Sequence, residues 1–540
     1  MQLGKDRPLN GHRHGIHRLH AAQPVNHEGA GELLGPLVGG RQSPQRQDFP
    51  VLSHGGYLNA MVIALDVGTS SVRATFYDAA GRAIGGRSHQ MEHAPTVTPD
   101  GGVEHDAARL LEGVVACLDA IHPNRPPEET RAVGVATFWH GLLGFDAAGH
   151  PITPVYTWAD TRSAGEAQLL RAALDDDALH ARTGCHLHSS YWPAKLRWVA
   201  RERPGEARRV ARWGSFGEFL ELSLFGEAAT SLSMASGTGL LDQEAGRWDP
   251  EALAAAEIEE RRLFPVASRT EPRRGLRTPW AGRWPALRTA SWFPAIGDGA
   301  ASNVGSDCVD RSRIALNVGT SAALRVVARD HPVPPRGLWR YRVDRARTVV
   351  GGSTSEGGNV FAWCRQVLRL GGDQEIEAAL AALSTDGHGL TILPHLAGER
   401  SPGWRGERRG VVSGLRLGTT AVEIMRAALE AVALRLAMVY GLLAPSASAG
   451  HVVVASGGAL GRSRVWTQII ADALGHPVTR SPEPEATSRG AALLALEALG
   501  VLPDLVAARQ ALGETFVPDH AHHARFLDAI ERQRRLDERV

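Results

Sequence analysis

Residues 64–70 read ALDVGTS, and residues 315–321 read ALNVGTS, so the two stretches differ only where Asn317 stands in the place of Asp66. In each copy an apolar run leads into Gly-Thr-Ser and continues as a second apolar run, SVRATF or AALRVV. Glycine tolerates the backbone of a tight bend, so each copy predicts a strand, a bend and a second strand. Two copies, each near the start of a segment of comparable length, indicate a duplicated domain.

The composition is that of a globular protein with room for two domains, because 43% of the 540 residues are hydrophobic and 22% are charged. The net charge is +1 and the periodic part of the chain has no dense basic run, so we expect no nucleic-acid partner. Apolar runs such as AALLALEALGVL end well short of the ~20 residues that span a membrane, and we predict no spanning segment.

The four cysteines, at positions 117, 185, 308 and 364, form no C-x-x-C pair. Their spacing fits neither a zinc site nor a disulfide framework, and we predict a cytoplasmic location. Residues 1–60 are rich in Gly, Pro, His, Arg and Gln and show neither helical nor strand periodicity. We predict that they are a disordered extension, or that translation begins at Met61.

After Met61, short apolar runs alternate with amphipathic stretches, which is typical of an α/β fold. One helix is predicted to follow Asp106, a preferred N-cap residue, because apolar residues then recur every three to four positions. Another is predicted to follow Thr420, which has Glu423 at the spacing of a capping box. Both helices are interpreted as core scaffolding.

The repeated bends are candidate phosphate-binding turns, because backbone amides and hydroxyls converge there. If the two bends face each other across a cleft, Asp66 can support Mg²⁺ while Asn317 avoids repelling the phosphates of a nucleotide. The alternative is that Asp66 only caps its own turn. Arg73 on the following strand favours the metal and phosphate role.

Two other nucleotide-binding designs are absent from the sequence. There is no G-x-x-x-x-G-K-[ST] stretch, and lysine occurs only at positions 5 and 195, which excludes a P-loop phosphotransferase. There is also no G-x-G-x-x-G between a predicted strand and helix, so dinucleotide binding is unsupported.

Two further segments carry candidate chemistry. Asp298 lies between two glycines in AIGDGAASNVGSDC, where it could accept the proton of an attacking hydroxyl, although Asp-Gly is also a common turn. Gly457 and Gly458 follow a predicted strand and would let an adenine ring lie against bare backbone. Close packing between strand and helix is the alternative there.

These four segments, in this order and with this spacing, resemble the FGGY family of carbohydrate kinases, of the actin-like ATPase superfamily, from Met61 to about Pro503. The resemblance implies an α/β fold of two actin-like (ribonuclease H-like) ATPase domains with an inter-domain cleft. It implies a sugar-binding N-terminal domain at residues 61–310, a nucleotide-binding C-terminal domain at 311–505 and a helical tail at 506–540.

The resemblance also implies site residues. Asp298 would be the catalytic base and Asp66 the residue that supports Mg²⁺. The implied ATP contacts are Gly68, Thr69, Ser70, Arg73, Gly319, Thr320, Gly358, Gly457, Gly458 and Arg462. The implied contacts to the acceptor sugar are Trp139, His140 and Asp298, with Tyr191 nearby.

The segments PITPVYTWADTRS, TGCHLHSSYWPAKLRWVA, SMASGTGLLD and LPHLAGERSPGW are most similar to the gluconokinase branch. This implies ATP-dependent phosphorylation of D-gluconate to 6-phospho-D-gluconate. Relatives usually have Met where this chain has Trp139, so xylulose, glycerol or another polyol stays an alternative acceptor. An anionic acceptor requires a cation or an array of donors, and the sequence does not indicate which Arg or Lys supplies it.

If the resemblance to the family is set aside, Trp158 and Tyr191 are interpreted as core aromatics and Lys195 as a surface charge. An alternative from another class is an actin-like nucleotide-binding regulator without catalysis, which has no need of TWADTRS and GDGAASNVG together. The expected partners are MgATP and a small sugar or sugar acid, and a homodimer is retained as an option.

Overall fold

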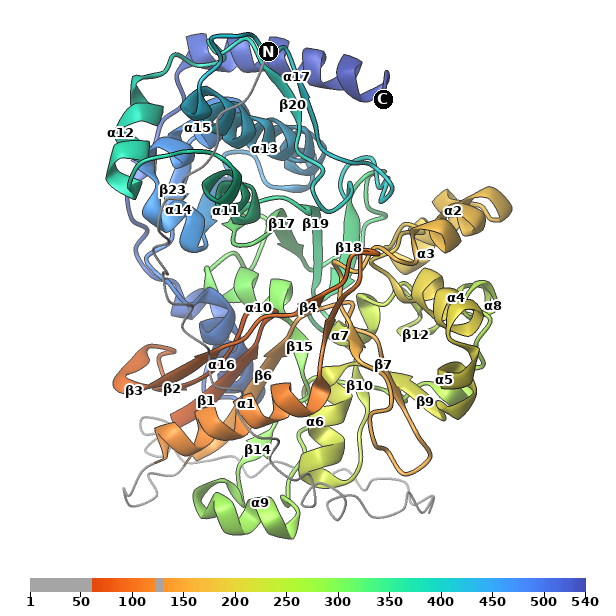
Figure 1. Ribbon diagram of the computed structural model, residues 1–540. Helices are drawn as coiled ribbons and strands as arrows, with labels where there is room; N and C mark the ends of the chain where they lie inside the picture. Colours follow the sequence, from red (N-terminus) through yellow and green to blue (C-terminus); the bar gives the residue numbers. More distant parts are fainter. Residues whose placement is uncertain (1–60, 123–129) are drawn as a thin grey trace, which may run out of the picture.

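The computed structural model describes residues 61–122 and 130–540, and our expectation for residues 1–60 lies outside this part of the chain. The chain forms two lobes, one above the other in Figure 1, and each lobe is built on its own sheet with helices packed against it. The predicted α/β class is confirmed.

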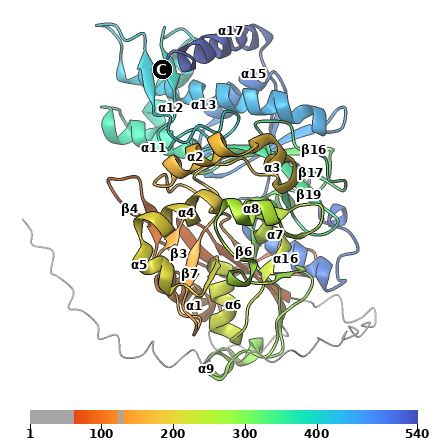
Figure 2. The same cartoon turned by 90° about the vertical axis from the view of Figure 1, so that its right-hand side faces the viewer.

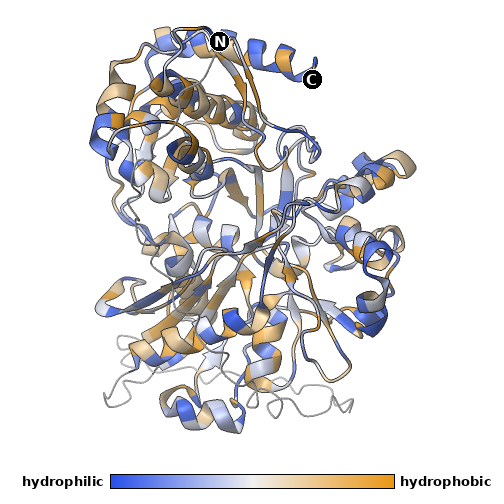
Figure 3. Cartoon of the chain, in the orientation of Figure 1, coloured by the Kyte–Doolittle hydropathy of each residue, from blue (hydrophilic) through white to orange (hydrophobic). Residues whose placement is uncertain are grey.

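The first lobe contains a six-stranded sheet in which β1 pairs antiparallel with β2 and parallel with β6. In spatial order its strands are β14 (Ser291–Trp292), β6 (Thr130–Thr137), β1 (Met61–Val67), β2 (Ser71–Tyr77) and β3 (Ala83–Glu92), with β15 (Ile296–Gly297) also on β6. Residues 62–65 of β1 are all buried, as expected of a central strand covered by helices. Figure 3 shows the strands of this sheet largely in apolar colours.

The second lobe contains a seven-stranded sheet with the same central pairing, because β16 pairs antiparallel with β17 and parallel with β22. In spatial order its strands are β18 (Trp339–Arg342), β19 (Thr348–Thr354), β17 (Ala322–Ala328), β16 (Arg313–Val318), β22 (Val452–Ser456), β23 (Val478–Arg480) and β24 (Thr515–Phe516). The duplication predicted from the repeated turn is therefore present as a repeated sheet topology.

The two hairpins differ in the length of their turns. In the first, the last paired residues are Val67 and Val72, so four residues form the turn, whereas Val318 and Ala322 leave three in the second. The extra residue shifts the register, and Arg73 lies opposite Asp66 while an alanine lies opposite Asn317.

The helices on the sheets confirm two sequence predictions. Helix α1 (Ala107–Ile121) is capped by the side chain of Asp106, which accepts hydrogen bonds from two backbone amides. Helix α13 (Ala421–Leu443) begins with the capping box of Thr420 and Glu423. Within the described residues, α13 is the one helix long and apolar enough to cross a membrane, and most of it is buried in the core of the second lobe.

Helix α16 (Ala486–Ala498) belongs to the second half of the chain but packs against β1, β6 and α10 (Asp298–Gly305) of the first lobe. A Cβ atom on Gly490 would lie 1.8 Å from the carbonyl oxygen of Ala301, so only glycine permits this helix contact. Part of the range predicted as the C-terminal domain therefore completes the core of the first lobe.

The outer part of the first lobe has its own apolar cluster, formed mainly by short helices that face the viewer in Figure 2. The helices of this lobe not yet named are α2 (Ala164–Ala173), α3 (Asp176–Thr183), α4 (Trp192–Glu202), α5 (Pro204–Arg209), α6 (Phe216–Phe225), α7 (Leu232–Ser236), α8 (Pro250–Ala255) and α9 (Thr278–Arg283).

The second lobe is completed by helices and a hairpin around its sheet. They are α11 (Gly358–Val367), α12 (Asp373–Ala382), β20 (Thr391–Leu393), β21 (Val411–Ser413), α14 (Gly458–Arg462), α15 (Arg464–Leu474) and α17 (His520–Asp537). The predicted terminal helix is thus present as α17, which packs against α13, α15 and β20 at the top of Figure 1.

Candidate active site

Asp298 is the first residue of α10, directly after the short strand β15. The Asp-Gly pair therefore begins a helix and does not form a simple turn. Oδ1 of Asp298 accepts hydrogen bonds from the backbone N–H groups of Gly299 (2.8 Å) and Trp139 (3.4 Å). Burial raises the pKa of Asp298, and the neighbouring Arg325 partly opposes this effect. A raised pKa makes this carboxylate a stronger base than an exposed one.

Asp298 lines a pocket between the two lobes. The other lining residues are Trp139, His140 and Trp158 from the first lobe, and Ser321, Arg325, Trp339, Tyr341, Ser353 and Arg400 from the second. The volume of the cavity is about 50 Å³, which is room for one or two water molecules. A sugar can enter only when the walls move apart, and movement of one lobe relative to the other would provide this opening.

Trp139 forms the wall of this pocket next to Asp298. Its indole lies on bare backbone, since a Cβ atom on Gly297 would be 1.8 Å from the ring and one on Gly299 would be 2.6 Å from it. Its Nε1–H donates a hydrogen bond to the carbonyl oxygen of Ser233 (3.0 Å). The large ring is therefore accommodated by glycines on both sides of Asp298 and is fixed in orientation.

His140 is held in a left-handed backbone conformation, with φ of 68°, which costs a non-glycine residue about 1–2 kcal/mol. The Nζ of Lys195 donates hydrogen bonds to the carbonyl oxygens of His140 (3.0 Å) and Ser190 (2.9 Å). Nδ1 of His140 donates to the carbonyl of Gly237 (2.5 Å). These bonds fix the ring of His140 in the pocket wall.

The prediction that Lys195 is a surface charge is wrong, because its side chain is buried. Burial lowers the pKa of Lys195 to about 7. No pattern in the sequence indicates this burial, since the residue lies in α4 between other buried side chains that come together only in the folded lobe.

Tyr191 lies behind the pocket wall. Its hydroxyl is 2.6 Å from that of Tyr341, and its ring meets His140 edge-on with centroids 5.1 Å apart. The structure therefore places Tyr191 as support for two lining residues, and Trp158, interpreted as a core aromatic without the family, lines the pocket itself.

Two arginines that the sequence did not single out point into the pocket. Nε and Nη1 of Arg325 and Nε of Arg400 are buried without a hydrogen-bond partner among the described residues. Burial lowers the pKa of Arg325 to about 10, with a further lowering by Arg400 and an opposing effect of Asp298. Arg325 follows the second repeated turn, and Arg400 lies in LPHLAGERSPGW, so both were close to quoted motifs. Their convergence depends on tertiary structure.

Asp66 and Arg73 lie side by side on the first hairpin, and Arg73 forms an ion pair with Glu485, just before α16, and a hydrogen bond with Gln90. Burial raises the pKa of Asp66 to about 7, and repulsion from Asp298 and Glu485 acts in the same direction. Glu485 was missed because it is far from the hairpin in sequence.

The first turn shows how far this side of the site fits Mg²⁺ and phosphate. Within the described part of the chain, no group donates a hydrogen bond to the Asp66 carboxylate, so its oxygens are free for a cation. The N–H of Gly68 donates to the carbonyl of Ser71 (2.9 Å), and Thr69 and Ser70 lie partly or fully exposed at the tip of the bend. Asp66 and the exposed tip of the turn therefore fit the expected binding of Mg²⁺ and phosphate.

The second turn lies among the glycines predicted to bind the nucleotide. The N–H of Gly358, at the start of α11, donates to the carbonyl of Gly319 (2.7 Å), and the next residue donates to Thr320 (3.1 Å). Gly457 has φ of 98°, and a Cβ atom there would lie 2.4 Å from the carbonyl of Val318. The second turn and the starts of α11 and α14 thus form a surface of bare backbone.

Two side chains complete this surface. A Cβ atom on Gly458 would be 3.2 Å from Nη1 of Arg462, which is exposed at the end of α14. Nδ2 of Asn317 donates to Oγ of Ser456 (3.1 Å), so the residue that replaces Asp66 in the second copy is neutral and already bonded.

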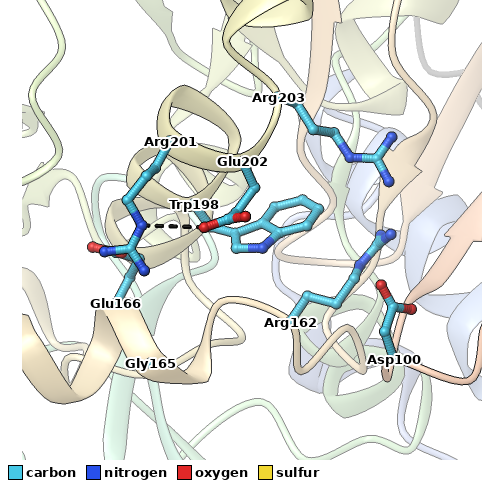
Figure 4. A pocket seen from close by; sticks show the side chains of 8 residues that line it. All are labelled: Asp100, Arg162, Gly165, Glu166, Trp198, Arg201, Glu202 and Arg203. Carbon is cyan, nitrogen blue, oxygen red and sulfur yellow. Dashed lines mark hydrogen bonds and ion pairs between the residues drawn. The ribbon is translucent and has the colours of Figure 1, made fainter.

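A larger hollow lies on the outside of the first lobe, away from these residues (Figure 4). It is lined by Asp100, Arg162, Gly165, Glu166, Trp198, Arg201, Glu202 and Arg203. Its charged side chains pair with neighbours: Arg201 with Glu166 (2.6 Å), and Arg162 with carboxylates outside the hollow. None of the predicted site residues lines it, whereas Trp139, His140 and Asp298 line the pocket between the lobes.

The repeated sheet topology, with a carboxylate in the pocket between the lobes, defines a two-domain α/β fold that this chain shares with solved carbohydrate kinases. Family models of the FGGY carbohydrate kinases match residues 61–305 as the N-terminal domain and 314–499 as the C-terminal domain. The chain belongs to the FGGY family of carbohydrate kinases, which confirms the resemblance. Kinases of this family use ATP, with Mg²⁺ as the usual ion.

Several characterised proteins are similar over most of their length. The gluconokinase of Bacillus subtilis (strain 168) is 27% identical over 472 residues, which are 85% of this chain and 91% of that protein. The glycerol kinase of Alkalilimnicola ehrlichii is 30% identical over 455 residues, 82% and 90% of the two chains. The structure of gluconate kinase from Lactobacillus acidophilus superposes with a TM-score of 0.80 at 24% identity, covering 89% and 98%, and supports the fold alone.

Proposed function

We propose that this kinase transfers the γ-phosphoryl group of MgATP to the terminal hydroxyl of D-gluconate, giving 6-phospho-D-gluconate. The observation that carries the proposal is the pair Arg325 and Arg400, two guanidinium groups that face the acceptor pocket with unpartnered N–H groups. The similarity to proteins named gluconokinase supports it further.

The charge of the pocket favours an acid over a neutral sugar. A buried donor without a partner costs about 1–3 kcal/mol, and a guanidinium more. A neutral polyol would satisfy these donors only with hydroxyls, whereas a carboxylate can accept two parallel bonds from one guanidinium. Asp298 is the lining residue that opposes this positive charge, and it has to stay free to act on the hydroxyl.

The chemistry follows from the placement of the two acids. The carboxylate of Asp298 would take the proton of the acceptor hydroxyl as its oxygen bonds to the γ-phosphorus and the bond from that phosphorus to ADP breaks. Mg²⁺, held by Asp66, would neutralise charge on the phosphates. The turns at Gly68–Ser70 and Gly319–Thr320 would hold the phosphates. Trp139 and His140 would orient the acceptor.

The remaining nucleotide contacts are part of the same proposal. Gly358, Gly457, Gly458 and Arg462 would bind the nucleoside, because Gly458 and Arg462 are exposed, Gly358 and Gly457 are partly exposed, and glycine has no side chain to keep a flat ring away from the backbone. Arg73 would hold the first hairpin through its ion pair with Glu485 while it lies next to Asp66. A homodimer and a cytoplasmic location stay predictions.

The test is ADP formation with gluconate, xylulose and glycerol as acceptors, for the wild type and for Arg325→Met. We expect turnover with gluconate, and a loss of kcat/KM of about 30-fold in the variant, the effect of one charged hydrogen bond. Arg329→Met, directly after the end of the same strand, is the matched control, because its side chain is exposed.

Each alternative has its own result. Preference for xylulose or glycerol, with no effect of Arg325→Met, would overturn the acid as acceptor and keep the kinase. ATP hydrolysis that no acceptor accelerates would support an actin-like nucleotide-binding regulator that has no sugar substrate, and ATP binding without any turnover would support the form without catalysis.

A further inference from the structure

The segment 394–408, which we call the Arg400 loop, contacts both lobes. Nη1 of Arg171 on α2 donates a hydrogen bond to the carbonyl of Trp404 (2.6 Å), and Nε2 of His188 donates to the carbonyl of Glu399 (3.1 Å). On the other side, the N–H of Ser401 donates to the carbonyl of Ser353 (2.9 Å). The loop therefore bridges the lobes at the acceptor pocket.

Arg400 takes its position from this loop. Its guanidinium lies over the rings of Trp158 and Trp404, 5.4 and 5.9 Å from their centroids. Trp404 has φ of 56°, a left-handed conformation that a non-glycine residue adopts only when its surroundings hold it. Within the described residues, Arg400 has no carboxylate partner that would hold its side chain directly. Its Nη2 lies 3.5 Å from Nε2 of His140, and the backbone of the loop sets how far the guanidinium reaches toward that ring.

The loop is held by a buried ionic cluster that includes the end of the chain. Glu399 pairs with Arg435 of α13 and with Arg405 (2.6 Å). Asp537, the last residue of α17, pairs with the same Arg405 and lies 3.9 Å from Arg435 and 3.8 Å from Arg408. Two carboxylates thus face three guanidinium groups, and loss of either carboxylate leaves an uncompensated buried charge.

A metal site is the competing interpretation of this cluster. His395, Glu399 and Asp537 each offer a ligand atom, all within 4.8 Å of one another. However, guanidinium groups already occupy both carboxylates, and a cation would add to three positive charges. Burial lowers the pKa of His395 to about 4, so its ring is neutral at pH 7 and adds no charge. The cluster is built as an ionic clamp.

We propose that Asp537 is a positioning residue for the acceptor: through Arg405 and Glu399 it holds the Arg400 loop, so the C-terminal helix sets acceptor affinity. This inference rests on the proposed function of Arg400 at the acceptor pocket. Loss of the Asp537 charge would loosen the loop and displace Arg400 without touching the nucleotide side. Small displacements of a binding group weaken binding strongly.

The experiment compares the full-length wild type with Asp537→Asn and with Asp528→Asn, a matched control at an exposed position of the same helix. We expect Asp537→Asn to raise the KM for gluconate about tenfold, with the KM for ATP unchanged. Backbone hydrogen exchange should become faster in residues 394–408 and stay the same in the first hairpin. Asp537→Glu keeps the negative charge and should raise the KM for gluconate less than Asp537→Asn does.

An unchanged gluconate KM in Asp537→Asn would overturn the proposal, as would an equal rise in both KM values or faster exchange throughout the chain. If Asp537→Asn does not fold, Arg405→Lys tests the same link, because it keeps the charge but loses the two-sided contact. If the wild type fails to phosphorylate gluconate, the proposed function fails, and the exchange comparison still tests the clamp.

Discussion

The two repeated hairpins share a strand order and most of their letters but differ in charge. In the first, Asp66 lies beside Arg73 with Glu485 near, and its carboxyl has a raised pKa of about 7. In the second, the amide of Asn317 is neutral and bonded to Ser456. Duplication thus reproduces the pairing of the strands around each turn, whereas the length of the turn and the charge at Asp66 or Asn317 differ.

The two hairpins also carry their arginines at different positions. The three-residue turn of the second hairpin leaves an alanine opposite Asn317, and Arg325 lies two residues further along β17, on the same face. The first hairpin has its arginine next to the carboxylate. One copy therefore has a charged pair near the predicted phosphates, and the other has an uncharged turn and contributes its cation to the acceptor pocket.

Asp298→Asn has the largest expected effect, because it removes the carboxylate of the first lobe that is proposed to act as the base. We expect turnover to fall about 1000-fold, since general-base catalysis contributes 10²–10⁴-fold. ATP binding, measured by calorimetry, should be unchanged. Turnover at the wild-type rate would show that Asp298 is not the base.

Asp66→Asn makes the first hairpin match the second. We expect turnover to fall about 100-fold, because the amide is a weaker ligand for Mg²⁺ than the carboxylate. The measurement is kcat as a function of Mg²⁺ concentration, and more Mg²⁺ should recover part of the activity. If the Mg²⁺ dependence stayed as in the wild type, the metal role of Asp66 would be wrong.

The dependence of activity on pH tests the role of Asp298 without a mutation. Burial raises the pKa of Asp298, and only the ionised form can take a proton, so kcat/KM for the acceptor should fall as pH decreases through that raised value. The fall should be about tenfold per pH unit and should begin above the ordinary carboxyl range near pH 4. The Asn317→Asp variant should show the same fall of kcat/KM at low pH. A limb at or below pH 4 would contradict the assignment.

Asn317→Asp makes the second hairpin match the first and has the smallest expected effect. A second carboxylate near the phosphates should weaken MgATP binding about fivefold through repulsion, with the gluconate KM unchanged. Calorimetric titration with MgATP checks this, with the wild type as the reference. Tighter MgATP binding would place the metal at the second turn.

Local patterns were sufficient to predict the hairpins, the capped starts of α1 and α13 and the glycines around the second turn, because each depends on residues close in sequence. Arg325, Arg400 and Glu485 could not be predicted, since their relevance depends on strands and loops from distant segments meeting at one place. The prediction that Lys195 is a surface charge was wrong for the same reason, because burial of a lysine depends on carbonyl groups that only tertiary structure brings together.

The return of α16 to the first lobe has a consequence for synthesis of the chain. The sheet of residues 61–297 lacks one covering helix until residues 486–498 have left the ribosome, so its apolar surface stays uncovered while the second half is translated. A fragment that ends near residue 310 would expose the same surface and be prone to aggregate. Folding of the first lobe is thus completed only after the second half of the chain has been translated.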